Sequence, residues 1–142
     1  MNDFWISFFA LLLAGTLISF VNYFLNHRIT KDNYKWQSYI KNIEQLEKYC
    51  EKIRNLCIAY WLKGEKTEKE IAAHINILLK FIHSLEIDES ICQPIKKELI
   101  SITGEDFGTP SIVNGEKKSN NAIILIYDIQ IQIQKYLYTK LA

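Results

Sequence analysis

Two cysteines, Cys50 and Cys57, have the side chains best suited to chemistry, because a thiolate is both a nucleophile and a metal ligand. They lie seven positions apart, so on a helix they share one face. Three nearby basic residues would lower the pKa of an exposed thiol, namely Lys48, Lys52 and Arg54. The same spacing belongs to a helix-packing seam, in which a buried cysteine behaves as a small hydrophobe. We therefore expect both thiols to lie in the core.

The remaining ionisable residues form no pattern that a reaction requires. His74 and His83 lie nine positions apart, too far to share one ion on a single helix, and no Cys-x-x-Cys motif completes a zinc site. Neighbouring acids such as Glu68 and Glu70 are typical of helix starts. The sequence has no phosphate-binding glycine loop and no hydrolase or zinc-protease motif. We expect no enzyme activity, no metal, no cofactor and no small-molecule substrate.

A long uncharged stretch at the N-terminus predicts where the protein resides. Residues 4–25 contain no charged side chain, and as a helix they would reach roughly 33 Å, enough to cross a bilayer core. A cleaved signal peptide is disfavoured because the start lacks basic residues and the exit lacks small ones. A helix buried in a soluble core would need cover on every side. We expect a transmembrane anchor over residues 1–26 and a cytosolic domain over residues 27–142.

The flanks of this span predict its orientation. Aromatic residues lie at both ends, where rings favour the headgroup layer. Residues 27–63 carry 8 basic and 4 acidic side chains, a net charge of +4, and basic flanks stay in the cytoplasm. The N-terminus should therefore lie outside an inner membrane of bacterial type. Three cysteines, a small and odd number, do not make a disulfide framework, which fits a reducing compartment. The basic residues alternate with acids, so we expect no binding of nucleic acid.

Small and polar residues inside the span could let two such helices approach closely. Ala10 and Ala14 are four positions apart, as are Gly15 and Ser19, and this small-xxx-small spacing is typical of transmembrane helix pairs. Asn22 could hydrogen-bond across such a contact. These five residues are the predicted transmembrane packing positions.

The cytosolic part shows helical periodicity throughout. Apolar residues between Trp36 and Tyr60 follow one another at alternating steps of three and four, which is the seam of a coiled-coil-like helix ending near Lys63. A capping box at Thr67 to Glu70 predicts the start of a second helix, which should end near Glu86. Asp88 or Ser90 should cap a third. The sequence thus predicts an all-α fold, an antiparallel bundle of about four helices behind the anchor.

Two points of this helical interpretation are open. Residues 128–134 alternate strictly between polar and apolar types, as a half-buried strand would, although a lone strand would have no partner in this chain. We favour a helix there, opening at Ser119 or Asn120. The anchor and the first cytosolic helix could form one continuous rod, because neither proline nor glycine lies between Leu25 and Trp36, or they could bend near Asn26.

A turn-rich stretch separates the last two predicted helices. It begins Thr103-Gly104-Glu105-Asp106-Phe107, in which Thr103-Gly104 should stop a helix and Asp106 should hold the turn. This stretch resembles the Thr-Gly-Gly-Asp-Phe turn of small bacterial membrane proteins that have one N-terminal span, a helical cytosolic part and no assigned activity. Glu105 replaces their second glycine. Thr103, Gly104, Asp106 and Phe107 form the predicted interaction loop. A structural corner is favoured over a ligand site there, because glycine and aspartate are ordinary turn residues.

These features together predict a binding function. We expect a single-pass protein of the inner membrane whose helical domain binds another protein or further copies of itself. The alternative is a membrane-perturbing effector or toxin whose transmembrane helix oligomerises under control of the bundle. In either case the lipid bilayer is a partner.

Overall fold

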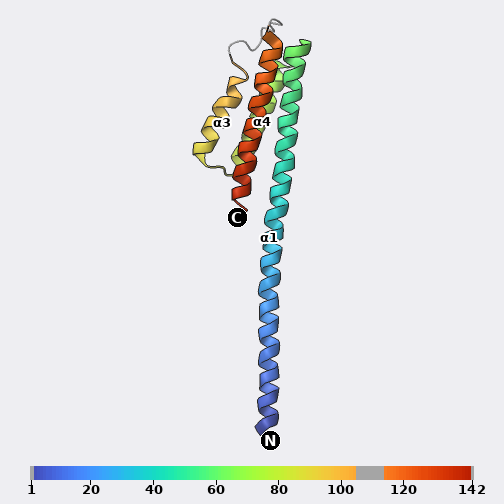
Figure 1. Cartoon of the computed structure of the whole chain (residues 1–142), viewed down its shortest axis with the longest axis vertical. Coiled ribbons are helices and arrows are strands. Elements are labelled where there is room, and N and C mark those ends of the chain that lie inside the picture. The colour runs from blue at the N-terminus through green and yellow to red at the C-terminus, as the bar shows by residue number, and fades with distance from the viewer. Residues whose placement is uncertain (1, 105–113, 142) are drawn as a thin grey trace. The chain divides into compact units, whose positions relative to one another are not determined.

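The computed structural model describes residues 2–104 and 114–141, with side chains described for residue 13 and from residue 15 onward. Four helices account for nearly all of these residues (Figure 1): α1 (Asn2–Lys63), α2 (Glu68–Ser84), α3 (Glu89–Ser101) and α4 (Gly115–Thr139). The described ranges contain no strand, so the expected all-α class is confirmed. Residues 128–134 lie within α4, which resolves their alternation in favour of the helix.

The chain divides into two compact units, Met1–Ser38 and Tyr39–Ala142. Helix α1 belongs to both, and it continues without a break from the predicted anchor into the helical bundle. The residues that connect the two units are helical and contain no helix breaker.

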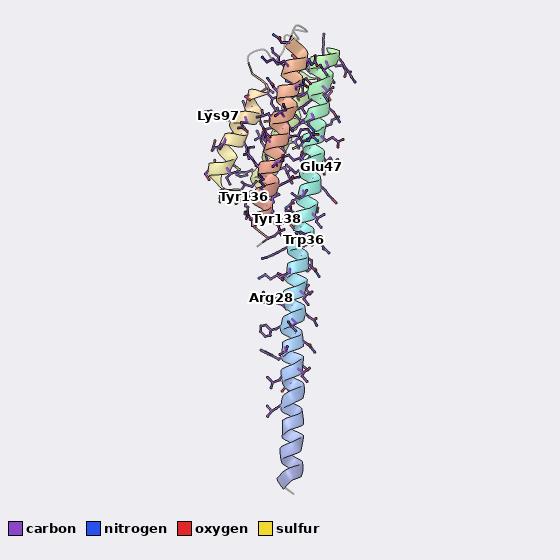
Figure 2. The ribbon with its side chains drawn as sticks, in the orientation of Figure 1. Arg28, Trp36, Glu47, Lys97, Tyr136 and Tyr138 are labelled. Atoms are coloured by element: carbon purple, nitrogen blue, oxygen red, sulfur yellow. The ribbon has the colours of Figure 1, made fainter. Side chains whose placement is uncertain are left out.

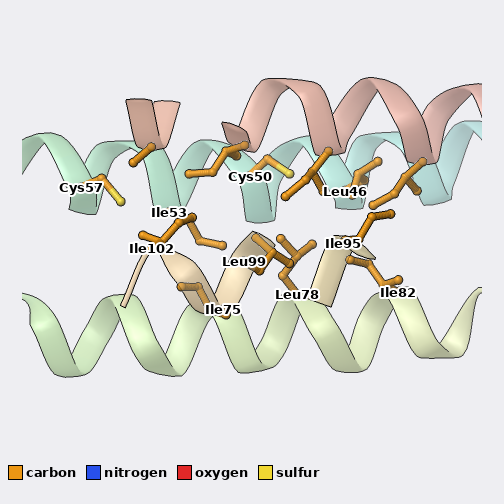
Figure 3. Close-up of a cluster of buried hydrophobic side chains, with 14 of the residues drawn as sticks. Leu46, Cys50, Ile53, Cys57, Ile75, Leu78, Ile82, Ile95, Leu99 and Ile102 are labelled. Atoms are coloured by element: carbon orange, nitrogen blue, oxygen red, sulfur yellow. The ribbon is translucent and has the colours of Figure 1, made fainter. Parts of the chain in front are cut away.

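A shared apolar core holds the second unit together. In the close-up of Figure 3, side chains from α1, α2 and α3 point toward one another between their ribbons. Most periodic positions predicted from sequence are buried, since one face of each helix turns inward. The start of the α1 seam differs, because Trp36 is 49% exposed and Tyr39 and Ile43 are only half-buried. The fully buried core residues include Leu46, Cys50, Ile53, Ile71, Leu78, Ile95, Leu99, Ile126, Ile129 and Ile133.

The contacts between helices establish an antiparallel arrangement. Along α1 and α4, the ring of Tyr39 lies 6.3 Å from that of Tyr138, whereas Arg54 contacts Gln130 further along. As residue numbers increase along α1, the residues of α4 that it contacts have decreasing numbers, so the two helices are antiparallel. Helices α1 and α2 are antiparallel as well, because Tyr49 stacks edgewise on Phe81 at the far end of α2. The expected antiparallel bundle is thus present within the second unit.

The predicted helix ends are largely correct, but one cap works differently. Helix α1 stops at Lys63 and is followed by Gly64, whose φ of +67° suits glycine. Thr67 precedes α2 as the capping box requires, yet its hydroxyl makes no cap hydrogen bond. It is buried and donates instead to the carbonyl oxygen of Leu56 on α1, at 3.2 Å. The capping-box prediction therefore placed the start of α2 correctly, but the predicted hydrogen bond from the Thr67 side chain to the α2 backbone is absent.

Helix α4 begins earlier than the sequence indicated. It starts at Gly115, four residues before the expected Ser119, because its first turn packs directly on the end of α1. A Cβ atom added at Gly115 would collide with the backbone carbonyl of Trp61. One turn further along, Ser119 is fully buried and its hydroxyl has no hydrogen-bond partner. Small side chains at these positions allow the two helices to approach closely.

The corner between α2 and α3 is tied to the C-terminal end of α4. Glu86 has a φ of +52°, a left-handed conformation that is uncommon outside glycine. Its carbonyl oxygen accepts a hydrogen bond from Lys140 Nζ at 2.7 Å and a longer one from the Tyr136 hydroxyl at 3.5 Å. The Lys140 ammonium also lies 4.9 Å from the centre of the Tyr136 ring. The left-handed residue is therefore held in place by groups at least fifty positions away.

We expect Gly115→Ala to destabilise the bundle by about 1–3 kcal/mol, because the added methyl group forces the α1 and α4 backbones apart. Ser119→Ala is the matched control on the same face. It removes an unpaired buried hydroxyl and should leave stability equal or higher. Thermal unfolding followed by circular dichroism measures both. A Gly115→Ala midpoint equal to that of the unmodified chain would contradict the close approach.

Candidate functional site

The two seam cysteines are placed for packing. Cys50 and Cys57 are fully buried in the core. Burial raises the pKa of each thiol from 9.0 to about 12. Arg54 does lower the pKa of Cys50, as the sequence suggested, but the loss of hydration outweighs it and Glu47 opposes it. At neutral pH both groups are therefore protonated and shielded, which suits a core and disfavours nucleophilic chemistry.

The third thiol lies beside an open groove. Cys92 is half-buried on α3, and burial followed by the charges of Glu89 and Asp88 raises its pKa. The groove between α2 and α3 has a volume of about 830 Å³ and is lined by Cys92 together with residues such as Lys80 and His83. Among the described residues, no group of three His, Cys, Asp or Glu side chains is arranged to hold a metal ion.

The histidines do not converge. His74 lies on α2 with its Nδ1 atom 2.8 Å from the carbonyl oxygen of Glu70, one turn earlier on the same helix. His83 lies in the α2–α3 groove, whereas His74 lines a separate depression between α1 and α2.

The predicted interaction loop is only partly within the described residues. Thr103 donates its hydroxyl to the carbonyl oxygen of Ile100 at 2.9 Å, and the Gly104 amide bonds to the Ser101 carbonyl. These two residues therefore terminate α3, as expected of a helix stop. Asp106 and Phe107 lie outside the described residues, so their predicted role stays a prediction.

The first unit has a continuous apolar surface. Its large side chains from Leu13 to Ile29 are more than half exposed, whereas those of the bundle core are buried. They lie on all sides of α1, so one helix packed against α1 could cover only some of them. We call this set the N-terminal apolar surface: Leu13, Leu17, Ile18, Phe20, Val21, Tyr23, Phe24, Leu25 and Ile29.

Three of the predicted transmembrane packing positions share one helical face. Gly15, Ser19 and Asn22 follow at steps of four and three, and the Ser19 hydroxyl bonds to the Gly15 carbonyl oxygen at 2.9 Å. A side chain at Gly15 would meet nothing within 4 Å, so the chain's own packing does not require glycine there. The side chains of Ala10 and Ala14 are outside the described set.

The structure also bears on the membrane span itself. In the part of the chain whose residues are described, no helix is both long and apolar enough to cross a bilayer. The side chains of residues 1–12 and 14, which include more than a third of the predicted span, lie outside that part.

One polar cluster was missed from the sequence. Arg54 Nη1 donates to Gln130 Oε1 at 2.9 Å, and the guanidinium carbon lies 4.1 Å from the centre of the Tyr127 ring. Gln130 is buried, so this hydrogen bond satisfies a polar group inside the α1–α4 contact. Each residue borders an apolar stripe, but nothing in a single sequence indicates a pairing across 76 positions.

Comparisons with known proteins returned no relative. No family model, no curated protein and no solved structure matches this chain. The resemblance to small bacterial membrane proteins therefore stays a prediction based on five loop residues.

We expect Cys92 to be the thiol that reacts first in the folded protein, because it is the least buried of the three. Maleimide labelling at about pH 7.5, followed by mass spectrometry, should show one fast site that Cys92→Ser removes. Labelling of Cys50 and Cys57 should require unfolding, since their pKa values of about 12 leave almost no thiolate. Rapid labelling of Cys50 or Cys57 in the folded chain would contradict this prediction and indicate a reactive thiol in the core.

Proposed function

We propose that this chain is a non-enzymatic, single-pass protein of the inner membrane whose helical domain acts as a protein-interaction module. The observation that carries the proposal is the N-terminal apolar surface together with the uncharged sequence over residues 4–25. Large hydrophobic side chains exposed around a helix require a covering, and lipid covers all sides at once.

The distribution of charge supports an orientation with the N-terminus outside. Arg28, Lys31 and Lys35 follow the apolar stretch closely on an exposed helix, and Asp32 is the only acid among them. Basic residues beside a span remain in the cytoplasm and are attracted by anionic headgroups. The ring of Tyr23, at the end of the uncharged stretch, stacks 6.2 Å from the ring of His27, which directly precedes these charges, and amphipathic rings are favoured at such a boundary.

The nature of the bundle supports a binding role. The buried thiols of Cys50 and Cys57 and the separated positions of His74 and His83 give no constellation for a reaction. The bundle nevertheless presents exposed hydrophobic side chains on its outer faces, which are the usual material of protein contacts. Binding of another protein or of further copies is therefore the function that these surfaces favour.

We expect the full-length chain to sediment with membranes and to resist extraction by alkaline carbonate. The double variant Leu13→Arg/Leu17→Arg should shift most of the protein to the soluble fraction, because each charge near the centre of a span costs about 2.5–3.5 kcal/mol. Ile100→Arg, an equally drastic change at an exposed residue of α3, is the matched control and should stay in the membrane fraction. Unmodified protein found in the supernatant would refute the anchor.

The effector alternative is separated from this proposal by a different measurement. A membrane-perturbing protein would depolarise cells on induction, as reported by a potential-sensitive dye, and Gly15→Leu would abolish that effect by widening the packing face. An interaction module should leave the potential unchanged in both forms. Depolarisation that depends on Gly15 would therefore replace the proposed function with the effector.

A further inference from the structure

Helix α4 has a second apolar stripe that faces away from the core. Ile124, Tyr127, Ile131 and Tyr138 are 58%, 48%, 45% and 61% exposed, although α4 already buries a full stripe on its opposite side. Their spacing of three, four and seven continues a heptad pattern, which is how a helix presents itself to another helix. The half-buried Gln134 occupies the one polar position of this series. We call the four apolar side chains the outer stripe.

The outer stripe is held in position by the fold. Arg54 lies against the ring of Tyr127 while its guanidinium bonds to Gln130, so that ring is fixed on α4. Tyr138, labelled near the end of α4 in Figure 2, stacks edgewise on Tyr39 of α1. Side chains that are already ordered lose little conformational entropy on binding.

Charges beside the stripe indicate what covers it. Asp128 and Lys135 are both exposed and lie one heptad apart on the same flank of the stripe, with Ile131 between them. When two copies of α4 pack antiparallel about a two-fold axis near Ile131, Asp128 of each copy faces Lys135 of the other copy. The same axis brings Ile124 opposite the second copy's Tyr138. Two opposite-charge contacts and the apolar contacts thus form together, as an isologous interface requires.

A parallel pairing lacks this complementarity. In a parallel pair each flank of one helix meets the opposite flank of the other, so Asp128 would face Ile123 and Lys135 would face Gln130 of the second copy. Neither contact joins opposite charges, and Gln130 is already buried in its bond to Arg54. The charges beside the stripe therefore favour the antiparallel orientation.

We infer that the outer stripe of α4 binds the outer stripe of a second copy of this chain, antiparallel, with Asp128 paired to Lys135 across the interface. This inference names the partner of the proposed interaction module and rests on that proposal. Within each bundle α1 is antiparallel to α4, so the two copies of the bundle part of α1 also run in opposite directions. The contact lies entirely within the second unit, Tyr39–Ala142, of each copy.

Charge reversal tests the inference with full-length chains carrying two different tags, co-expressed and captured in mild detergent. Asp128→Lys places two lysines against each other in both contacts, and Lys135→Asp places two acids together in both. Each variant should lose self-capture by at least about fivefold, as expected when two exposed pairs change from attraction to repulsion. Co-expressing the Asp128→Lys chain with the Lys135→Asp chain should restore capture to near the unmodified level, because every contact is again between opposite charges.

The apolar part of the interface has its own test. Ile131→Asp should abolish capture, whereas Ile100→Asp, at a similarly exposed position on α3, should not. Circular dichroism of each variant verifies that the helical fold is retained. Membrane sedimentation is measured in the same extracts, so that failure of the anchor and failure of the self-contact are distinguished.

Three outcomes would overturn the inference. The first is unchanged capture in both Asp128→Lys and Ile131→Asp, which would assign association to other surfaces such as the Gly15 face. The second is a mixed pair that captures no better than Asp128→Lys alone. The third is an unmodified chain that fails to capture itself and binds a different protein through the outer stripe, which would make this stripe a site for a foreign helix.

Discussion

The close contact between the last turns of α1 and the first turn of α4 is the constraint on which the bundle depends. Gly115 lies against the backbone of Trp61, and this approach sets the register of two helices that stay in contact as far as Tyr39 and Tyr138. The same register aligns Arg54 with Gln130 and buries the periodic isoleucines of α4. Helices α2 and α3 then complete a core that α1 and α4 alone would leave exposed on one side.

Much of this arrangement was predictable because it follows from periodicity. The seam through Cys50 and Cys57 and the stop at Gly64 follow from spacing and backbone preference. The helix over residues 128–134 was favoured because a lone strand would have no partner in this chain. What was not predictable depends on tertiary contact. The Thr67 hydroxyl bonds to α1 instead of capping α2, and α4 gains an extra turn because Gly115 has α1 to pack against. The pKa of the Cys50 thiol was likewise not predictable, because burial raises it more than the neighbouring Arg54 lowers it.

The candidate sites likewise divide into features that periodicity predicted and features that depend on tertiary contact. Gly15, Ser19 and Asn22 share a face, as their spacing indicated. The outer stripe of α4 was hidden within the alternating sequence that had suggested a strand. Ile129 and Ile133 are core residues, whereas Ile131 between them is exposed. The alternation of apolar and polar residues therefore arises because isoleucines lie on two different faces of the helix. Periodicity alone picked out the inward face, whereas the exposure of Ile124, Tyr127, Ile131 and Tyr138 came from the structure.

The hydrogen bond from Lys140 to the carbonyl oxygen of Glu86 means that Lys140 helps to fix the corner between α2 and α3. Chain ends are usually the safest place for fusions and trimming, because few contacts are made there. Here, loss of Lys140 and the residues after it would release the corner that joins α2 and α3 and leave Glu86 in a left-handed conformation without its main restraint. Removal of Lys140 should therefore loosen a corner that lies more than fifty positions away in the sequence.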